Sequence, residues 1–117
     1  MIVSDEEKIL QVVFFATDGG HQPVRDWLRQ ELSREDRTIV GTDLKTVEYR
    51  WPLGMPTVRK MEPGLWEVRS RLTKGVARVL FTVMGRRMIL LHGFVKKSRK
   101  TPANDLDTAR RRLTLLR

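Results

Sequence analysis

The stretch "GLWEVRSRLTKGVARVLFTVMGRRMILLHGFV", residues 64–95, decides the fold of this chain of 117 residues. Its first part, Trp66–Arg71, alternates apolar with charged side chains, as a strand with one buried face does. The runs Val76–Val83 and Met88–Val95 are almost wholly apolar, and they are rich in β-branched residues. Turn segments that contain glycine separate the three runs. The stretch therefore predicts an antiparallel meander of three strands.

The first 56 residues predict one strand and two helices. Ile9–Phe15 is a short apolar run, typical of a buried strand. Pro23 fits the first position of a helix, and Ser33 fits the cap of a second helix. Apolar residues at helical spacing continue the second helix: Val40, Leu44, Val47 and Trp51. We expect these two helices to form an antiparallel pair packed on the sheet.

Two further segments complete the predicted order of elements. Proline-containing breaks occur at residues 51–56 and 62–64, so the segment between them is interpreted as a loop. Thr101 is expected to cap a last helix with Pro102 at its first position. The predicted fold is α+β, with the order β-α-α-β-β-β-α. One domain, residues 1–117, contains a small, mostly antiparallel sheet with helices on one face.

Composition limits the class of protein. The chain has no cysteine, which excludes disulfides and thiolate metal sites. No apolar run reaches the roughly 18 residues that a membrane span needs. The acidic N-terminus does not resemble a signal peptide. These features predict a cytoplasmic protein that does not associate with membranes.

Positive charge is concentrated in the second half of the chain. Residues 1–56 contain 7 Lys/Arg and 10 Asp/Glu, a balance of −3, whereas residues 57–117 contain 16 and 4, a balance of +12. A basic half on a small domain favours a polyanionic partner, because cations that neutralise phosphates release condensed counterions. The alternative is a charged surface that serves only solubility. We expect nucleic acid as the partner, without a choice between RNA and DNA.

Arginines on the predicted strands are the first candidates for phosphate contacts. Arg69 and Arg71 share one strand face with Glu67. Arg78 interrupts an apolar strand, where an unpaired cation is costly to bury. It either forms a salt bridge, for example with Glu67, or opens onto a concave face that binds phosphate.

A cluster of cations follows the last predicted strand, at Lys96, Lys97, Arg99 and Lys100. The predicted helix start at Thr101 comes directly after it, and a helix N-terminus attracts anions. Together these groups predict a phosphate pocket. The alternative is an exposed charged loop without a role.

The first candidate for proton transfer in this region is His92. Its unperturbed pKa near 6.5 suits a general acid or base, although a lone strand histidine is more often structural. Crowded lysines of the cluster are further candidates, since neighbouring cations depress lysine pKa values. His21 is interpreted as a surface turn residue, and Trp66 either stacks on a base or packs in the core. No metal-binding cluster or paired-carboxylate motif is visible, so no cofactor and no metal are expected.

The ordered motifs of the second half resemble a known family. "GLWEVRSRLTKGVARVLFTV", residues 64–83, and "ILLHGFVKKSRKTPANDLDTARRR", residues 89–112, closely resemble the phage-derived Gp49-like family. That family is the HigB-type branch of the RelE/ParE toxin superfamily. RelE proper often uses a C-terminal tyrosine, but the only tyrosine here is Tyr49, in the second predicted helix.

This resemblance implies the toxin of a type II toxin–antitoxin system, an mRNA interferase that cuts transcripts in the ribosomal A site. The implied partners are mRNA, the ribosome and a helix-turn-helix antitoxin of the HigA type, through which alone the toxin reaches operator DNA. The expected catalytic residues are Arg69, Arg78, His92 and Lys97. The expected RNA-binding residues are Arg71, Lys96, Arg99 and Lys100. Two alternatives remain: a ParE-like toxin that poisons gyrase, and a non-catalytic module that binds nucleic acid or regulates its operon.

Overall fold

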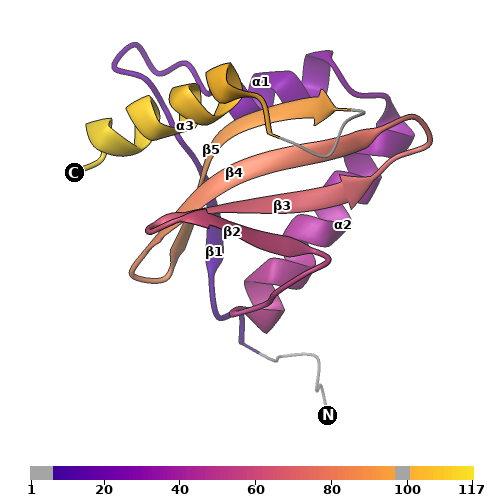
Figure 1. The fold of residues 1–117 in the computed structure, drawn as a ribbon, viewed down its shortest axis with the longest axis horizontal. Helices are drawn as coiled ribbons and strands as arrows, with labels where there is room; N and C mark the ends of the chain where they lie inside the picture. Colours follow the sequence, from indigo (N-terminus) through magenta and orange to yellow (C-terminus); the bar gives the residue numbers. More distant parts are fainter. Residues whose placement is uncertain (1–6, 97–100) are drawn as a thin grey trace.

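The structure is a computed structural model of the chain, and it describes residues 7–96 and 101–117 (Figure 1). The elements follow in the order β1 (Gln11–Phe14), α1 (Pro23–Gln30), α2 (Arg34–Arg50), β2 (Val58–Glu62), β3 (Leu65–Arg71), β4 (Val76–Met84), β5 (Arg87–Lys96) and α3 (Ala103–Leu115). The strands form one sheet in the order β1-β5-β4-β3-β2. β1 is parallel to β5, and all other pairs are antiparallel. The predicted α+β class and the β3-β4-β5 meander are confirmed.

β2 corrects the sequence prediction, which treated the segment before residue 62 as a loop. Val58 of β2 pairs with Val68 of β3 and is buried. The strand lies at the edge of the sheet, and its register shifts between Lys60 and Glu62. A strand of five residues between two prolines is too short for a periodic signal, so pairing with β3 decides its conformation.

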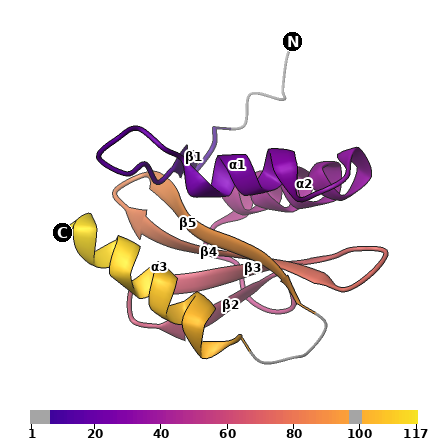
Figure 2. The ribbon, with the colours of Figure 1, turned by 90° about the horizontal axis from the view of Figure 1, so that it is seen from above.

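The helices cover both faces of the sheet, which corrects the prediction that they share one face. Figure 2 shows α1 and α2 on one side and α3 on the other. On β4, Val79 and Phe81 pack in the core beneath α1 and α2, whereas Leu80 packs in the core beneath α3. α3 adds Ala109 and Leu113 to this second core. Covering both faces explains why β4 and β5 are apolar almost without alternation.

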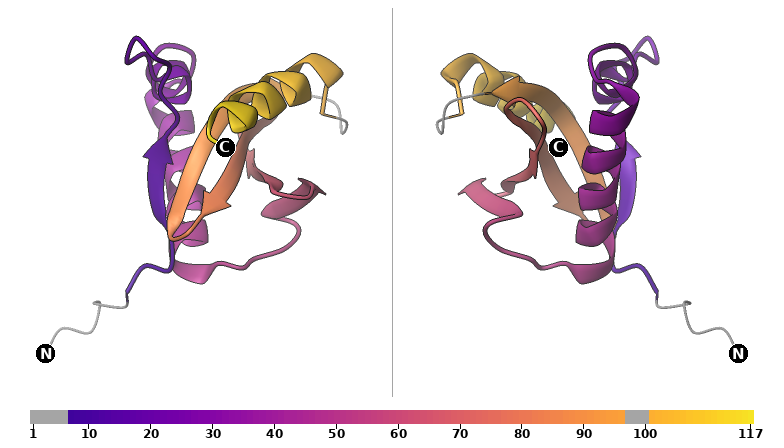
Figure 3. Two further views of the ribbon diagram at one scale, coloured as in Figure 1. Left: turned by 90° about the vertical axis from the view of Figure 1, so that its left-hand side faces the viewer. Right: turned by 90° about the vertical axis from the view of Figure 1, so that its right-hand side faces the viewer.

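The two N-terminal helices begin where the sequence predicts but do not form a pair. Pro23 is in the first turn of α1, and the backbone N–H of Asp36 donates to the Ser33 hydroxyl at 3.1 Å. α1 packs on β5 and β1, and α2 packs on β3 and β1. Figure 3 shows α1 almost end-on while α2 runs lengthwise, so the predicted antiparallel pair is wrong. The main contact of α1 is with β5, and that of α2 is with β3.

An aromatic cluster joins the end of α2 to the sheet. Trp66 stacks on Phe81 with ring centroids 5.9 Å apart, and Trp51 meets both rings edge-on at 5.1 and 5.7 Å. Such pairs contribute about 0.5–1.5 kcal/mol each beyond burial. Of the two interpretations of Trp66, core packing is therefore the correct one.

α1 approaches β5 very closely at Gly93. A Cβ at this position would lie 2.5 Å from the Trp27 Cε3 atom, so only glycine lets the indole ring lie against the strand.

In residues 7–96 and 101–117, none of the helices has the length and apolar composition to span a lipid bilayer.

Candidate functional site

Three cations lie on the side of the sheet that α3 covers, in the row of Arg78 and in the row after it. Arg71 of β3, Val76 of β4 and Lys96 of β5 are cross-strand neighbours in one row, and Arg69 belongs to the next row. Strands are about 4.8 Å apart, so Arg71 and Lys96 originate roughly 10 Å from each other. Arg71 is exposed, and Arg69 and Lys96 are half-buried. We call Arg69, Arg71 and Lys96 the basic face.

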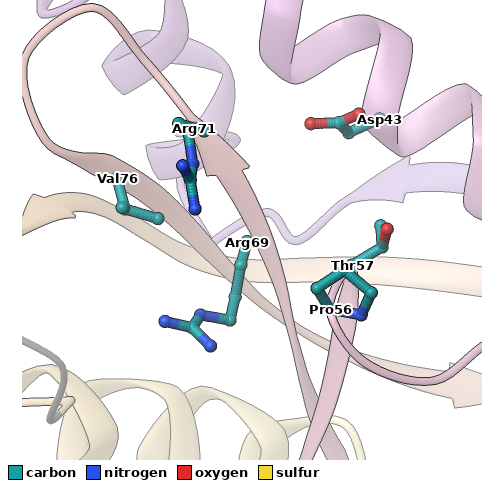
Figure 4. Close-up of a pocket in the computed structure, with 6 residues that line it drawn as sticks. All are labelled: Asp43, Pro56, Thr57, Arg69, Arg71 and Val76. Atoms are coloured by element: carbon teal, nitrogen blue, oxygen red, sulfur yellow. The ribbon is translucent and has the colours of Figure 1, made fainter.

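A cavity of about 300 Å³ opens beside this basic face (Figure 4). Its lining comes from α2, the segment before β2, β3 and β4: Asp43, Pro56, Thr57, Arg69, Arg71 and Val76. In Figure 4, the two arginines extend from β3, and Asp43 points toward the opening from α2. A hydrogen bond of 2.8 Å from the Arg69 backbone N–H to the Thr57 carbonyl oxygen holds the segment before β2 against β3. The volume is at the lower end of small-ligand pockets, ~300–1,000 Å³.

The two arginines of this cavity have few acidic partners within the described residues. Arg71 forms no ion pair within the described parts of the chain. The Nε atom of Arg69 is buried without a hydrogen-bond partner among the described residues, and it lies 4.0 Å from Glu67 Oε1. Desolvated guanidinium groups with free donors bind phosphate well, because their planar fork matches two phosphate oxygens.

Arg78 does not reach this surface, so the predicted open, phosphate-binding position is wrong. Its side chain is fully buried, and Nη1 lies 3.9 Å from Glu67 Oε1. Nη1 also donates to the Thr101 hydroxyl at 3.2 Å, and that hydroxyl donates to Glu67 Oε2 at 2.6 Å. Desolvation by burial lowers the pKa of Arg78 from its ordinary value, and the Glu67 carboxylate opposes that shift. The salt bridge with Glu67 is the alternative that the structure shows.

The Thr101 hydroxyl forms hydrogen bonds with the buried Arg78 and Glu67 and does not cap the helix that follows. α3 begins at Ala103 with Pro102 as its N-cap, and no side chain caps it. The predicted Thr101 cap is therefore wrong, because the Thr101 hydroxyl donates its hydrogen bond to Glu67 instead. This contact fixes the start of α3 beside the buried Arg78.

His92 lies on β5 with both ring nitrogens engaged. Nε2 is 2.6 Å from Asp105 Oδ1, and Nδ1 is 3.5 Å from Arg112 Nη1. Arg112 also donates to the Leu91 carbonyl oxygen at 2.8 Å, and burial lowers its pKa below the ordinary arginine value. The ring of His92 stacks on Phe94 with centroids 5.7 Å apart. This geometry matches the structural alternative for His92, which ties α3 to the sheet.

The other histidine is near the same region but on a different element. His21 is an exposed residue before α1, as expected, and its Nδ1 lies 2.9 Å from Asp26 Oδ2. A second cavity of about 390 Å³ between α1 and β5 has both His21 and His92 in its lining. The basic face contributes no residue to it, so the structure does not bring either histidine to the arginine cavity.

Three of the predicted site residues, Lys97, Arg99 and Lys100, lie outside the described residues. Of the eight residues predicted, the structure brings Arg69 and Arg71 together in the cavity and adds Lys96 in the same row. Sequence reasoning missed Asp43 and Thr57. No signal pointed to them, because Asp43 looks like an ordinary polar position of an amphipathic helix and Thr57 follows a proline.

The site combines fixed cations, one hydroxyl and one carboxylate in a half-open cavity. Such a set can hold a phosphodiester, stabilise negative charge on its oxygens and accept a proton. Within residues 7–96 and 101–117, no group of three or more His, Cys, Asp or Glu residues is placed to hold a metal ion.

Comparison with known proteins shows a family. The model of a family described as phage-derived protein Gp49-like matches residues 26–114, which include α2, the basic face and α3 up to its last residue but one. The search of curated proteins found no match.

Proposed function

This chain belongs to the phage-derived Gp49-like family, and from this premise we propose that it is the toxin of a type II toxin–antitoxin system. Its activity is that of an endoribonuclease, an mRNA interferase that cuts messages on the translating ribosome and so inhibits translation. The HigB-type, RelE-like placement of the family agrees with the α+β fold. A HigA-type helix-turn-helix antitoxin is its partner, neutralising the toxin and linking it to operator DNA.

The single observation that carries the proposal is the arginine cavity. Arg69 and Arg71 meet in one half-open pocket, where Arg71 has no ion pair within the described residues and Arg69 shares the Glu67 carboxylate with Arg78. An extended chain of phosphates is the ligand that such a surface attracts. Lys96 in the same row supports a neighbouring phosphate.

The roles of the candidate residues follow from their positions. Arg69 and Arg71 contact the scissile phosphate and stabilise the charge that develops on it during cleavage. Lys96 holds the adjoining RNA backbone. Lys97, Arg99 and Lys100 are given the same role from the sequence alone, because they follow Lys96 in the basic run. Arg78 and His92 act at a distance, because their side chains anchor β4, β5 and α3 around the site.

The experiment is induced expression of the chain alone in a bacterial host, with primer extension on several abundant messages. We expect growth arrest and new 5′ ends within translated codons. The double variant Arg69→Ala/Arg71→Ala is expected to lose both effects. The matched control, Arg29→Ala/Arg34→Ala, removes two exposed arginines from α1 and α2, and it is expected to behave as the wild type.

The other outcomes separate the alternative functions. Growth arrest with intact messages and altered DNA supercoiling favours a ParE-like toxin that poisons gyrase. Harmless expression of a folded chain favours a non-catalytic nucleic-acid-binding or operon-regulating module. If the wild type and the Arg69→Ala/Arg71→Ala variant cut messages equally, the nuclease activity is supported but this cavity is excluded as its site.

A further inference from the structure

Asp43 is the one carboxylate in the lining of the arginine cavity. It lies in the middle of α2, directly before the buried Leu44, and its side chain is half-buried. α2 packs against β3, so the helix brings this carboxylate to the arginines of the strand. Figure 4 shows the carboxylate directed toward the cavity on the side of Arg71.

The carboxylate of Asp43 is not used to hold the fold together. An acid placed beside two arginines ordinarily forms a salt bridge, and Glu67 does so with Arg78 in the same sheet. Asp43 forms neither an ion pair nor a side-chain hydrogen bond within the described residues, although Arg69 and Arg71 line the same cavity. A half-buried acid that is kept near cations but apart from them is free to accept a proton from a ligand between them.

The proposed cleavage of RNA needs a group that removes the proton of the 2′-hydroxyl. His92 is unsuited to this step, because Asp105 and Arg112 occupy its two ring nitrogens. Among the residues that line the arginine cavity, Asp43 has the only side chain with a carboxylate. The proton acceptor therefore lies on α2, a helix that contributes no residue to the basic face.

We infer that Asp43 is the general base of this site, and that Arg69 and Arg71 hold the phosphate next to it. This inference rests on the proposed function. The Asp43 carboxylate takes the proton of the 2′-hydroxyl while the 2′ oxygen forms a bond to phosphorus. The bond from phosphorus to the 5′ oxygen breaks, and that oxygen takes a proton from water. The products are a 2′,3′-cyclic phosphate and a 5′-hydroxyl end, and the carboxylate then returns its proton to solvent.

The test measures cleavage and binding separately in the variant Asp43→Asn. Cleavage is followed on a reporter message in a cell-free translation reaction, with the chemistry of the new 5′ ends determined by kinase labelling. Binding is followed by fluorescence anisotropy with a 2′-O-methyl oligoribonucleotide, which cannot be cleaved by this route. Glu35→Gln removes an exposed carboxylate from the first turn of the same helix and is the matched control.

We expect Asp43→Asn to cleave at least about 100-fold more slowly, within the range of general base catalysis, and to bind RNA at least as tightly as the wild type. Binding is retained because the variant removes a negative charge from a cavity that holds phosphate. Asp43→Glu, which keeps a base, is expected to recover part of the rate.

The remaining outcomes overturn the inference. If the wild type cuts the message and Asp43→Asn cuts it equally well, Asp43 is not the base, and the proposed nuclease function stands. If Asp43→Asn loses RNA binding, or its circular dichroism shows loss of folding, then the residue has a structural role. If the wild type leaves the message intact, the proposed function fails together with the inference. New ends with a 5′-phosphate exclude the transesterification step.

Discussion

At the scale of single residues, two arginines that are cross-strand neighbours have opposite roles. Arg69 and Arg78 face each other on β3 and β4, on the same side of the sheet. Arg69 borders a cavity with its side chain 23% exposed, whereas Arg78 is fully buried against Glu67. The segment before α3 contributes to this difference, because the Thr101 hydroxyl accepts a hydrogen bond from Arg78.

Replacing Arg78 with alanine is expected to lower the free energy of unfolding by about 3–5 kcal/mol, because the buried Glu67 carboxylate then loses its fully buried cation partner. Urea unfolding measures this change. Growth arrest is relieved in this variant through loss of folded protein rather than loss of a phosphate contact. The double variant Glu67→Gln/Arg78→Met, which removes both charges, is expected to recover much of the stability. Unchanged stability of Arg78→Ala would contradict the buried ion pair.

Two glycines are expected to respond with opposite signs to substitution by alanine. At Gly93 the added Cβ meets the ring of Trp27 at 2.5 Å, so overpacking costs about 1–3 kcal/mol. At Gly41, an exposed position of α2 with open space, alanine is expected to stabilise by about 0.5–1 kcal/mol. Thermal unfolding of both variants by circular dichroism is the measurement. A rise in Tm for Gly93→Ala would contradict the close packing of Trp27 on Gly93.

At the scale of elements, α2 does more than cover the sheet, because Glu48 holds β1 in place. The backbone N–H of Val12 donates to Glu48 Oε2 at 2.6 Å, and Lys8 Nζ lies 3.3 Å from Oε1. The carbonyl oxygen of Glu48 also accepts from the N–H groups of Ile9 and Leu10. β1 is an edge strand, so these contacts satisfy backbone donors that no further strand can reach.

Replacement of Glu48 by alanine is expected to cost about 1–3 kcal/mol, because a backbone donor on β1 then lacks its acceptor. Hydrogen exchange is expected to accelerate most at the Val12 amide. The Lys8→Ala variant is the comparison, and it is expected to change stability by less than about 1 kcal/mol because that side chain is one-third exposed. Equal protection of Val12 in the wild type and in Glu48→Ala would show that this contact does not hold β1.

At the scale of the whole molecule, charge is divided between the two halves of the chain. Residues 57–117 have a balance of +12, whereas residues 1–56 have −3. The second half builds β2 to β5 and α3, so the sheet and its last helix carry the positive charge. α1 and α2 on the other face are nearly neutral by comparison, and this asymmetry orients a polyanion toward the basic face.

RNA affinity is therefore expected to fall steeply with salt, and Arg71→Ala is expected to reduce the slope of log K against log salt by about 0.7, the value for one single-strand phosphate contact. Anisotropy titrations of the 2′-O-methyl oligoribonucleotide between about 50 and 200 mM salt provide the slopes. Arg29→Ala, on the exposed face of α1, is expected to leave the slope unchanged. Equal slopes for the wild type and Arg71→Ala would place the RNA on another surface.

Local sequence patterns determined the helix starts at Pro23 and near Ser33, the three strands of the meander and the basic second half of the chain. Each of these depends on neighbours within a few residues or on composition, so one sequence is enough to predict it. The ordered motifs of residues 64–83 and 89–112 likewise placed the chain in its family.

Only the tertiary structure decided which side chains remain open to a ligand. Periodicity correctly placed Glu67, Arg69 and Arg71 on one face, but it does not say that α3 crosses that face and buries part of it. The same holds for β2, which is a strand through its pairing with β3, and for Asp43, which reaches the arginines through the packing of α2. These features depend on contacts between residues far apart in the chain, and the free energy of such contacts is not encoded in any local pattern.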